Sequence, residues 1–289
     1  MKRLLILSFL VAFLLSCSEN PISESTQPSN SEKWMINIAT DITRATATAF
    51  ENGDKVGLYV VTTPNSLAAN GNHVDNTCFT YSAGSWSSAT PVYWKDQTTK
   101  TDFYCYYPYV SEIASIDAYS FVVKADQSSE ANYKASDFLW GKTADVAPTE
   151  DAVEIKVKHL MSNVIIKLIA GNGFTAEDLA SASVVVCGLK NKASIHLATG
   201  AVTAIGDATD ITPMAEDGQY NVLLVPQSVT DTDLIKVTIG DQTYTLNQSV
   251  TLESGGQYNC NVTLERVNQG INIGIDGWTY KSDFGGTAQ

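Results

Sequence analysis

Positive charge is scarce in this sequence of 289 residues. It has 18 Lys and Arg residues against 31 Asp and Glu, which gives a formal net charge of −13 at pH 7. Two of the basic residues, Lys2 and Arg3, lie in a leader that we expect to be removed, so the mature chain would be more acidic still. Binding to nucleic acid needs clustered Lys and Arg to neutralise phosphates. The charge balance therefore excludes nucleic acid as a partner.

Motifs for catalysis or metal binding are also missing. The three histidines, His73, His159 and His196, lie far apart and form no H-E-x-x-H pattern, and the sequence has no G-x-S-x-G elbow and no P-loop. The run Asp231-Thr232-Asp233 lacks the glycine and distal glutamate of a calcium loop, so we interpret it as a solvated turn. We expect His159, at a strand end, to be structural. The sequence predicts no enzyme activity, no catalytic residues, no cofactor and no metal.

Cysteines are few and widely spaced. Beyond Cys17 they are Cys78, Cys105, Cys187 and Cys260, with no C-x-x-C pair. This spacing fits neither a small disulfide scaffold nor a zinc site. Each cysteine lies in a strand-like segment, which favours buried thiols. Disulfide pairing stays open, because the cell envelope permits it.

Only one long hydrophobic run is present, Leu4 to Leu15, and it follows Lys2 and Arg3. It is shorter than the roughly 20 residues that span a bilayer, so we interpret residues 1–16 as a cleaved signal peptide. Its end, Leu14-Leu15-Ser16-Cys17, resembles a lipobox. We expect Cys17 to carry acyl chains such as palmitate, which tether the protein to a membrane. The alternative is an ordinary signal peptide with an incidental cysteine.

Helical periodicity is nearly absent from the rest of the chain. Residues 17–33 are rich in Ser, Asn, Glu, Gln and Pro and form a flexible tether. Short runs of Val, Ile, Tyr, Thr and Phe bounded by Gly, Asn, Asp and Pro follow, and only Thr175 to Ala180 suggests a short helix. We predict an all-β chain with two tandem β-sandwiches, at residues 34–159 and 160–289.

Two segments of this β pattern stand out for their alternation. Hydrophobic residues occupy alternate positions in the first strand and again near the chain end, and these residues are Trp34, Ile36, Ile38, Ile42, Ile271, Ile273, Ile275 and Trp278. Such alternation indicates strands with one buried face. The first strand runs into small and polar residues around Arg44 and Ala45, which we expect to form an exposed loop.

Several short motifs, in this order, point to a family. They are Thr43-Arg44-Ala45, Phe50-Glu51-Asn52-Gly53-Asp54-Lys55-Val56-Gly57-Leu58-Tyr59, Tyr93-Trp94, Phe103 to Tyr109, Ser136 to Gly141, His159 to Val164, Gly256-Gln257-Tyr258 and Ile273 to Trp278. Together with the lipobox, they make the chain resemble the fimbrillin-like lipoproteins that form type V pili in Bacteroidales.

The resemblance implies a fold and a mode of assembly. The two sandwiches would be transthyretin-like and antiparallel. The chain would be exported as a lipoprotein to the outer membrane and cell surface, and an arginine-specific protease would cut it between Arg44 and Ala45. Residues 34–44 would then be a removable first strand and residues 271–289 a donor strand. Donor-strand exchange with other pilus subunits, identical or different, would build a fimbria that supports adhesion.

Two other functions stay open at this point. One is a non-polymerising glycan-binding surface lipoprotein, for which the aromatic residues Tyr104, Tyr106, Tyr107 and Tyr109 would have to form an exposed platform. The other is an envelope hydrolase, which lacks a recognisable pair of nucleophile and base. The subunit's place in a pilus, as stalk, tip or anchor, also stays open.

Overall fold

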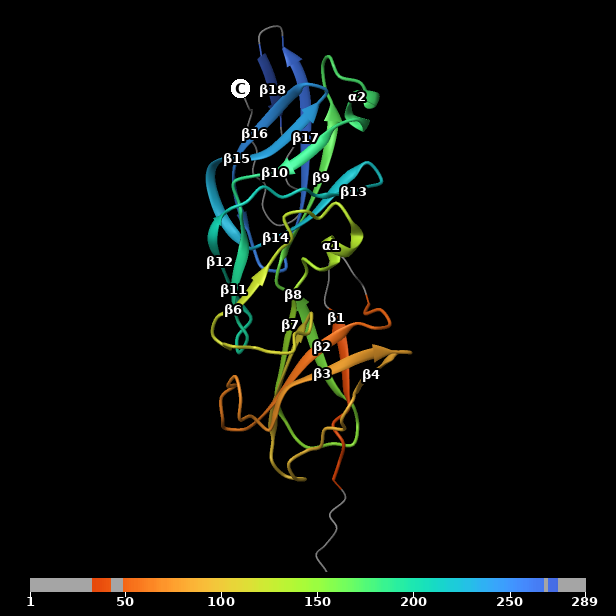
Figure 1. Ribbon diagram of the computed structural model, residues 1–289, viewed down its shortest axis with the longest axis vertical. Coiled ribbons are helices and arrows are strands. Elements are labelled where there is room, and N and C mark those ends of the chain that lie inside the picture. The colour runs from red at the N-terminus through yellow and green to blue at the C-terminus, as the bar shows by residue number, and fades with distance from the viewer. Residues whose placement is uncertain (1–32, 43–48, 268–269, 275–289) are drawn as a thin grey trace, which may run out of the picture. The chain divides into compact units, whose positions relative to one another are not determined.

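The computed structural model describes residues 33–42, 49–267 and 270–274. The predicted signal peptide, Cys17, the tether up to residue 32, Arg44, Ala45, Ile275 and Trp278 lie outside these residues. The described chain consists mostly of strands, with two short helices (Figure 1). None of its helices is long and hydrophobic enough to cross a membrane. The all-β prediction is confirmed.

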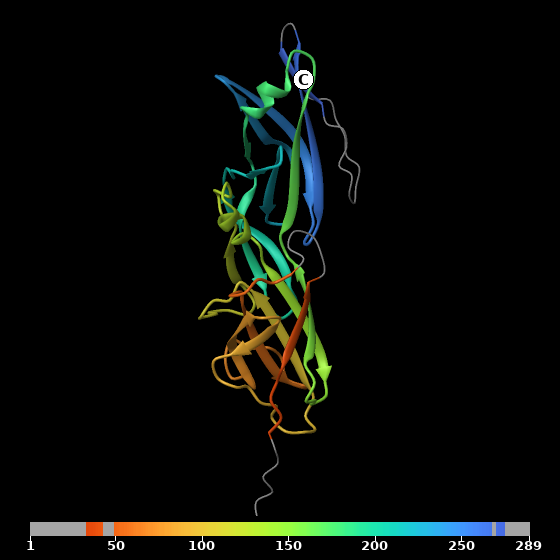
Figure 2. The ribbon, with the colours of Figure 1, turned by 90° about the vertical axis from the view of Figure 1, so that its right-hand side faces the viewer.

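The first half of the chain builds a seven-stranded sheet with the order β1-β8-β7-β5-β2-β3-β4. Strand β1 lies beside β8 along one edge (Figure 2). The bounds of these strands are β1 Ile38–Ile42, β2 Lys55–Thr62, β3 Val74–Ser82, β4 Ser85–Ser88, β5 Thr101–Tyr107, β7 Leu139–Val146 and β8 Val153–His159.

This sheet folds over on itself. Strands β7 and β8 form ladder pairs at Leu139 and Trp140, and farther along Thr143 Oγ1 of β7 donates to Glu154 O of β8 (2.9 Å). Buried side chains of β1 and β8 then pack with those of β2 and β5 in one hydrophobic core. Strand β2 is buried on both faces, because Val56, Leu58 and Val60 point into this core while its alternate residues point the other way.

A three-stranded sheet covers the other face of β2 and β5. Its order is β12-β11-β6, with β6 at Tyr119–Val122, β11 at Lys190–His196 and β12 at Ala201–Ala208. Phe121 of β6 and Ile195 of β11 pack against Tyr59 and Tyr106 of the first sheet. This small sheet joins a strand that precedes residue 159 to two that follow it. The domain boundary at residue 159 stays a prediction.

The second half forms a sandwich of two further sheets, of orders β13-β14-β9-β17-β18 and β10-β15-β16. The hydrophobic faces of both sheets meet in one core, with Val164 and Tyr258 on one side and Val237 and Leu246 on the other. The bounds of these strands are β9 Ser162–Ala170, β10 Ser183–Val186, β13 Met214–Glu216, β14 Gln219–Leu224, β15 Gln227–Ile239, β16 Gln242–Leu252, β17 Gln257–Val267 and β18 Gly270–Gly274.

The sheets are not purely antiparallel, so that part of the predicted fold was wrong. Strand β1 runs parallel to β8, and β9 runs parallel to β17. More than 80 residues separate the strands of each pair in sequence, which is ample for the crossover that a parallel pair requires. Strand periodicity has the same value of two in both arrangements, so the sequence pattern could not distinguish them.

Local predictions met mixed outcomes. Gly240 and Asp241 form the turn between β15 and β16, and this dipeptide is a typical signal for a two-residue hairpin turn. The expected short helix is α2, Ala176–Ala180, with Thr175 and Asp178 forming a capping box. Helix α1, Glu130–Lys134, was missed, although Ser129 caps its first turn. The turn expected at 231–233 was wrong, because these residues continue β15 through a bulge.

The four described cysteines are free thiols. Cys105, Cys187 and Cys260 are buried, and Cys78 is half-buried. Burial raises the pKa of Cys105 and of Cys260 to about 12, because a thiolate would be desolvated there. These thiols therefore act as small hydrophobic core groups, as the strand-like context indicated.

Candidate functional site: the first strand, its groove and an adjoining cavity

The first regular strand is shorter than the sequence predicted. Residues 34–37 precede β1 and pair instead with the segment after β4: Ile36 N donates to Val92 O (2.8 Å) and Trp94 N donates to Trp34 O (2.9 Å). Strand β1 then continues along β8, with Ile38 opposite Val153. The segment from Trp34 to Ile42 therefore changes partner along its length, which hydrophobic alternation alone does not reveal.

The alternation itself is confirmed in the described side chains. Ile36 and Ile38 are 2% and 5% exposed and belong to the core inside the seven-stranded sheet, and Trp34 packs against that core. Met35, between them, is 46% exposed. Burial of an aliphatic side chain contributes about 1.5–3 kcal/mol to stability. Ile36 and Ile38 therefore stabilise this segment in its groove.

Trp86 of β4 contacts both flanks of the segment that holds Arg44. On one side, its indole Nε1 donates to Thr40 Oγ1 of β1 (2.9 Å). On the other side, its ring meets Phe50 edge to face, with ring centroids 4.9 Å apart. Trp86 thus brings the two edge strands of the seven-stranded sheet together. The sequence did not single out this residue.

The proposed donor segment falls largely outside the described residues. Strand β18, at its start, pairs antiparallel with the edge of β17, placing Ile271 opposite Arg266 and Ile273 opposite Leu264. It is therefore the outermost strand of its sheet.

The exposed aromatic platform that the glycan-binding alternative requires does not form from these four tyrosines. Tyr104 and Tyr106 are 6% and 2% exposed and lie in the core between the first sheet and the three-stranded sheet. Tyr107 is half-buried and packs near Phe50. Two of the four tyrosines are therefore unavailable to a sugar ring.

No catalytic constellation appears in the part of the chain that the structure describes. No group of three or more His, Cys, Asp and Glu side chains there is arranged to hold a metal ion. His159 is buried at the end of β8, with Nδ1 2.7 Å from Oδ2 of Asp137. His196 lies 3.4 Å from Asp117 at the surface, and His73 Nε2 lies 2.7 Å from the carbonyl of Tyr93. Each of the three histidines thus contacts a different partner.

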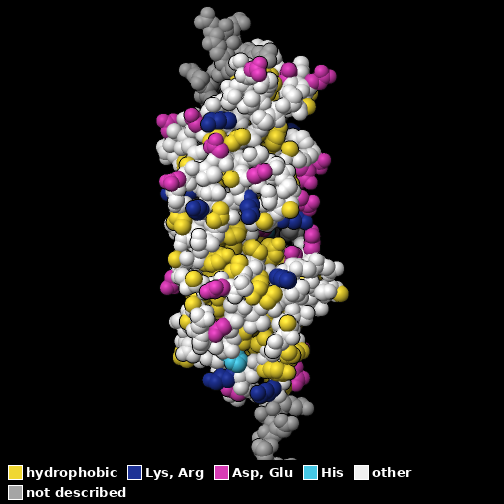
Figure 3. Space-filling view, in the orientation of Figure 1, with side chains coloured by type: hydrophobic (Ala, Val, Ile, Leu, Met, Phe, Trp, Pro, Cys, Tyr) yellow, Lys and Arg dark blue, Asp and Glu magenta, His cyan; other side chains and the backbone are white. Residues whose placement is uncertain are grey.

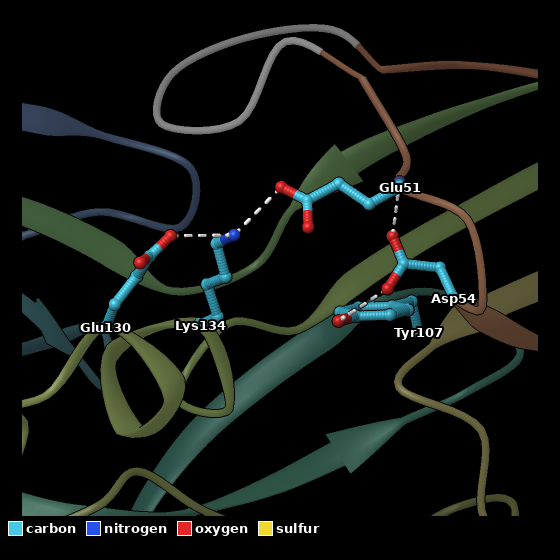
Figure 4. A network of polar contacts seen from close by, with 5 residues as sticks. All are labelled: Glu51, Asp54, Tyr107, Glu130 and Lys134. Carbon is cyan, nitrogen blue, oxygen red and sulfur yellow. Dashed lines mark hydrogen bonds and ion pairs between the residues drawn. The ribbon is translucent and has the colours of Figure 1, made fainter.

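A network of polar contacts lies where helix α1 meets the start of β2 (Figure 4). Lys134 Nζ reaches Glu51 Oε1 at 2.8 Å and Glu130 Oε1 at 2.9 Å, and these two contacts hold its pKa above the ordinary value. Asp54 accepts from Glu51 N (2.8 Å) and from the hydroxyl of Tyr107 (3.4 Å). Burial and the nearby carboxylate of Asp54 raise the pKa of Tyr107 to about 12.

Beneath this network is a cavity of about 230 Å³. It is lined by the network residues, by Phe50 and Tyr133, by the buried pair of Asp137 and His159, and by Glu216 of β13. The lining residues come from positions 49 to 223, so no local motif marks the site.

Elsewhere on the surface, Figure 3 shows hydrophobic side chains gathered over the middle of one face, with acidic side chains on either side.

Comparison with known proteins gives a consistent picture. A family model described as fimbrillin-like matches residues 43–278. A protein of Bacteroides uniformis named "Putative fimbrium subunit Fim1C" is 23% identical, and the alignment covers 96% of this chain and 95% of that one. A "Putative fimbrium tip subunit Fim1C" of Bacteroides ovatus is 28% identical over 42% of this chain and 24% of its own length.

Two solved structures share the fold. Each is a crystal structure titled as that of a "putative cell adhesion protein", one from Bacteroides uniformis and one from Bacteroides ovatus. Their sequence identities are 21% and 23%, and both TM-scores are 0.66. The first covers 86% of this chain and 97% of the solved one, and the second covers 86% and 98%.

Proposed function

The chain belongs to the fimbrillin-like family, and from that premise we propose that it is a structural subunit of a cell-surface fimbria that supports adhesion. In this proposal it is exported as a lipoprotein through Cys17, reaches the outer membrane, and is cut between Arg44 and Ala45. It then joins other subunits by donor-strand exchange. It is not an enzyme, and its two sandwiches are variants of the transthyretin-like type.

The observation that carries this proposal is the position of the first segment. Strand β1 is the outermost strand of its sheet and pairs with β8 alone among the described strands. Its Ile36 and Ile38 nevertheless fill the core of that sheet. A segment of this kind can be removed without cutting through the middle of a sheet. Its departure would leave a hydrophobic groove and the unpaired edge of β8.

Such a groove favours another strand. Unpaired backbone groups along a sheet edge are a template for a strand from another chain. An incoming strand with alternating hydrophobic residues restores both the hydrogen bonds and the buried side chains, as in donor-strand complementation. In the proposal, Ile271, Ile273 and Ile275, followed by Trp278, supply this alternation. Because the contact is head to tail, each joined subunit offers a new groove, and the assembly extends as a filament.

Digestion with an arginine-specific protease tests the proposal. Beyond the leader the sequence contains only two arginines, Arg44 and Arg266, so the fragment masses identify the cut without ambiguity. Arg266 lies in β17 and pairs with Ile271, which protects its backbone. We expect cleavage after Arg44, followed by a ladder of oligomers on an unheated gel and filaments in electron micrographs.

Matched variants sharpen the test. Arg44→Ala should abolish both cleavage and the ladder, whereas Arg266→Ala should leave both intact. Deletion of residues 271–289 should permit cleavage but stop assembly. A protein that is cut after Arg44 and stays monomeric at high concentration would refute strand exchange for this chain. Lipidation has a separate test, in which Cys17→Ala should release the protein from the membrane fraction.

A further inference from the structure

Two lysines face each other where the described chain enters the first sheet. Met35 and Tyr93 form an antiparallel bridge. Two residues farther along in the same register, Lys33 lies opposite Lys95. Like charges directly opposite each other destabilise a strand pair. In a chain with a net charge of −13, such a pair favours an anionic partner that neutralises it.

Hydrophobic side chains are exposed at the same place. Trp94 lies in the core of the seven-stranded sheet and Trp34 packs against that core, which leaves the residues that alternate with them outside. Met35 is 46% exposed and Tyr93 is 41% exposed. They are two of the four large hydrophobic side chains that are exposed in the part of the chain that the structure describes. We define the entry patch as Lys33, Met35, Tyr93 and Lys95.

The lysines of the entry patch are not neutralised by the acidic side chains around them. The ion pairs that lysines form among the described residues involve Lys100, Lys134, Lys142 and Lys156. An open groove of about 500 Å³ adjoins the patch, and both patch lysines line it. Asp75 is the one described carboxylate in this lining, and it accepts from N and Nδ2 of Asn72 (3.0 and 2.6 Å). Asp96 accepts within its own turn, from Thr98 N and Thr99 N (2.8 and 2.6 Å).

The entry patch lies where the expected tether joins the folded chain. The tether, residues 17–33, ends at Lys33 and would begin at an acylated Cys17. In Figure 1 the first described residues, in red, lie at the lower end of the seven-stranded sheet, and Figure 3 shows Lys or Arg side chains next to hydrophobic ones at this end. A short linker raises the effective concentration of a tethered surface to the order of millimolar. A weak contact between the patch and a membrane is therefore sufficient.

We propose that the entry patch docks on an anionic lipid surface. The two ammonium groups contact lipid phosphates, and the side chains of Met35 and Tyr93 enter the headgroup region, where amphipathic aromatic rings are favoured. The protein as a whole is acidic, but charges farther away than a Debye length of about 8 Å are largely screened at physiological ionic strength. The inference rests on the proposed lipoprotein export, because acylation brings the patch to a membrane.

The composition of the patch links docking to assembly. Lys33 and Met35 precede the proposed cut after Arg44. Tyr93 and Lys95 follow it and stay in the sheet. Departure of the first strand would thus remove half of the patch together with the lipid anchor. A subunit that has exchanged this strand would no longer dock on the membrane.

Co-sedimentation with vesicles at low ionic strength tests the proposal. The protein is the chain with Cys17→Ala, produced without its leader, and the vesicles are phosphatidylcholine alone or an equal mixture of phosphatidylcholine and phosphatidylglycerol. We expect preferential binding to the mixed vesicles. The affinity should fall about fivefold in Lys33→Gln or Lys95→Gln and about 25-fold in the double variant. Tyr93→Ser should weaken binding to both kinds of vesicle.

A matched control and a soluble probe complete the test. Lys124 is exposed and lies outside the patch, so Lys124→Gln should bind as the unmodified protein does. The experiment needs neither acylation nor cleavage, so its failure is distinguishable from failure of the proposed function. Equal binding to both kinds of vesicle, or a loss in Lys124→Gln as large as that in Lys95→Gln, would overturn docking. Calorimetric binding of the methyl glycoside of galacturonic acid without binding to vesicles would also overturn it and would indicate a site for acidic sugars.

Discussion

The indole Nε1 of Trp86 donates a hydrogen bond to Oγ1 of Thr40 across 2.9 Å. Trp86 belongs to β4 and Thr40 to β1, which are the two edge strands of the seven-stranded sheet. This contact therefore closes the folded-over sheet at its open side. It also makes Trp86 a direct neighbour of the segment that leaves in the proposed assembly.

We predict that Thr40→Val lowers the free energy of unfolding by about 1 kcal/mol, because it removes this hydrogen bond at nearly constant side-chain volume. Urea unfolding followed by tryptophan fluorescence measures the change. Thr245→Val, at an exposed position of β16, is the matched control and should change stability little. Equal effects of the two substitutions would show that the Trp86 contact does not stabilise β1.

The buried isoleucines of the first segment give a second prediction. Ile36→Ala and Ile38→Ala each remove a buried side chain from a packed core, so each should destabilise the protein by about 2–5 kcal/mol. Met35→Ala, between them and 46% exposed, should cost far less. Denaturant unfolding curves for the three variants give the loss in unfolding free energy, and so show whether the segment is packed into the core or only loosely attached. A loss for Met35→Ala as large as that for Ile36→Ala would contradict the burial pattern.

Sequence periodicity predicted those features that depend on one face of one strand. The buried pair of Ile36 and Ile38 follows from an alternation that the strand carries by itself. A turn with a local sequence signal can be recognised in the same way, as at Gly240-Asp241. Which strands pair, and in which direction, depends on residues more than 80 positions apart, so the parallel pairs β1–β8 and β9–β17 were missed.

The cavity could not be predicted for the same reason. No local sequence motif marks the residues that line the cavity. They come together only because the segments around β2, α1, β8 and β13 meet in the fold, as for Glu51, Lys134, Asp137 and His159. Trp86 is a comparable case, because its role arises from contact with β1 across the sheet. The sequence did place His159 at a strand end and gave it a structural role. It gave no sign that Nε2 of this buried imidazole would lack a hydrogen-bond partner among the described residues.

The stability of the first sheet should depend on pH through Asp102. Burial alone would raise the pKa of this carboxyl, but hydrogen bonds from Asp145 N (2.8 Å) and Lys142 Nζ (3.0 Å) outweigh burial and lower it. A lowered folded-state pKa means that the unfolded chain binds more protons, so stability rises with pH. The contribution is fully present above the unfolded pKa of about 4 and is lost as pH falls through the folded value.

We therefore predict that Asp102→Asn flattens the fall in unfolding free energy between pH 5 and acidic pH, relative to the unmodified protein. Denaturant unfolding at a series of pH values measures this. Asp241→Asn removes one carboxylate from an exposed turn, so the difference between the two variants isolates the Asp102 site. Curves for the two variants that coincide would mean that Asp102 contributes nothing specific.

The last prediction concerns Gly200, in the turn between β11 and β12. Its φ is +71°, a conformation that side-chain-bearing residues rarely adopt, and a Cβ there would lie 2.5 Å from Cε3 of Trp140. Trp140 has little freedom to move away, because its Nε1 donates to Leu197 O across 2.7 Å in a buried position. Gly200→Ala should therefore suffer both backbone strain and overpacking.

Gly218 separates these two effects. Its φ is +75°, close to that of Gly200, but a Cβ at this position would meet nothing within 4 Å. Gly218→Ala should thus cost only the strain of about 1–2 kcal/mol, whereas Gly200→Ala should cost about 1–3 kcal/mol more, because the methyl group displaces the indole. Urea unfolding of both variants gives the difference directly. Equal losses would mean that the Trp140 indole yields without cost, and that its bond to Leu197 does not fix the three-stranded sheet against β7.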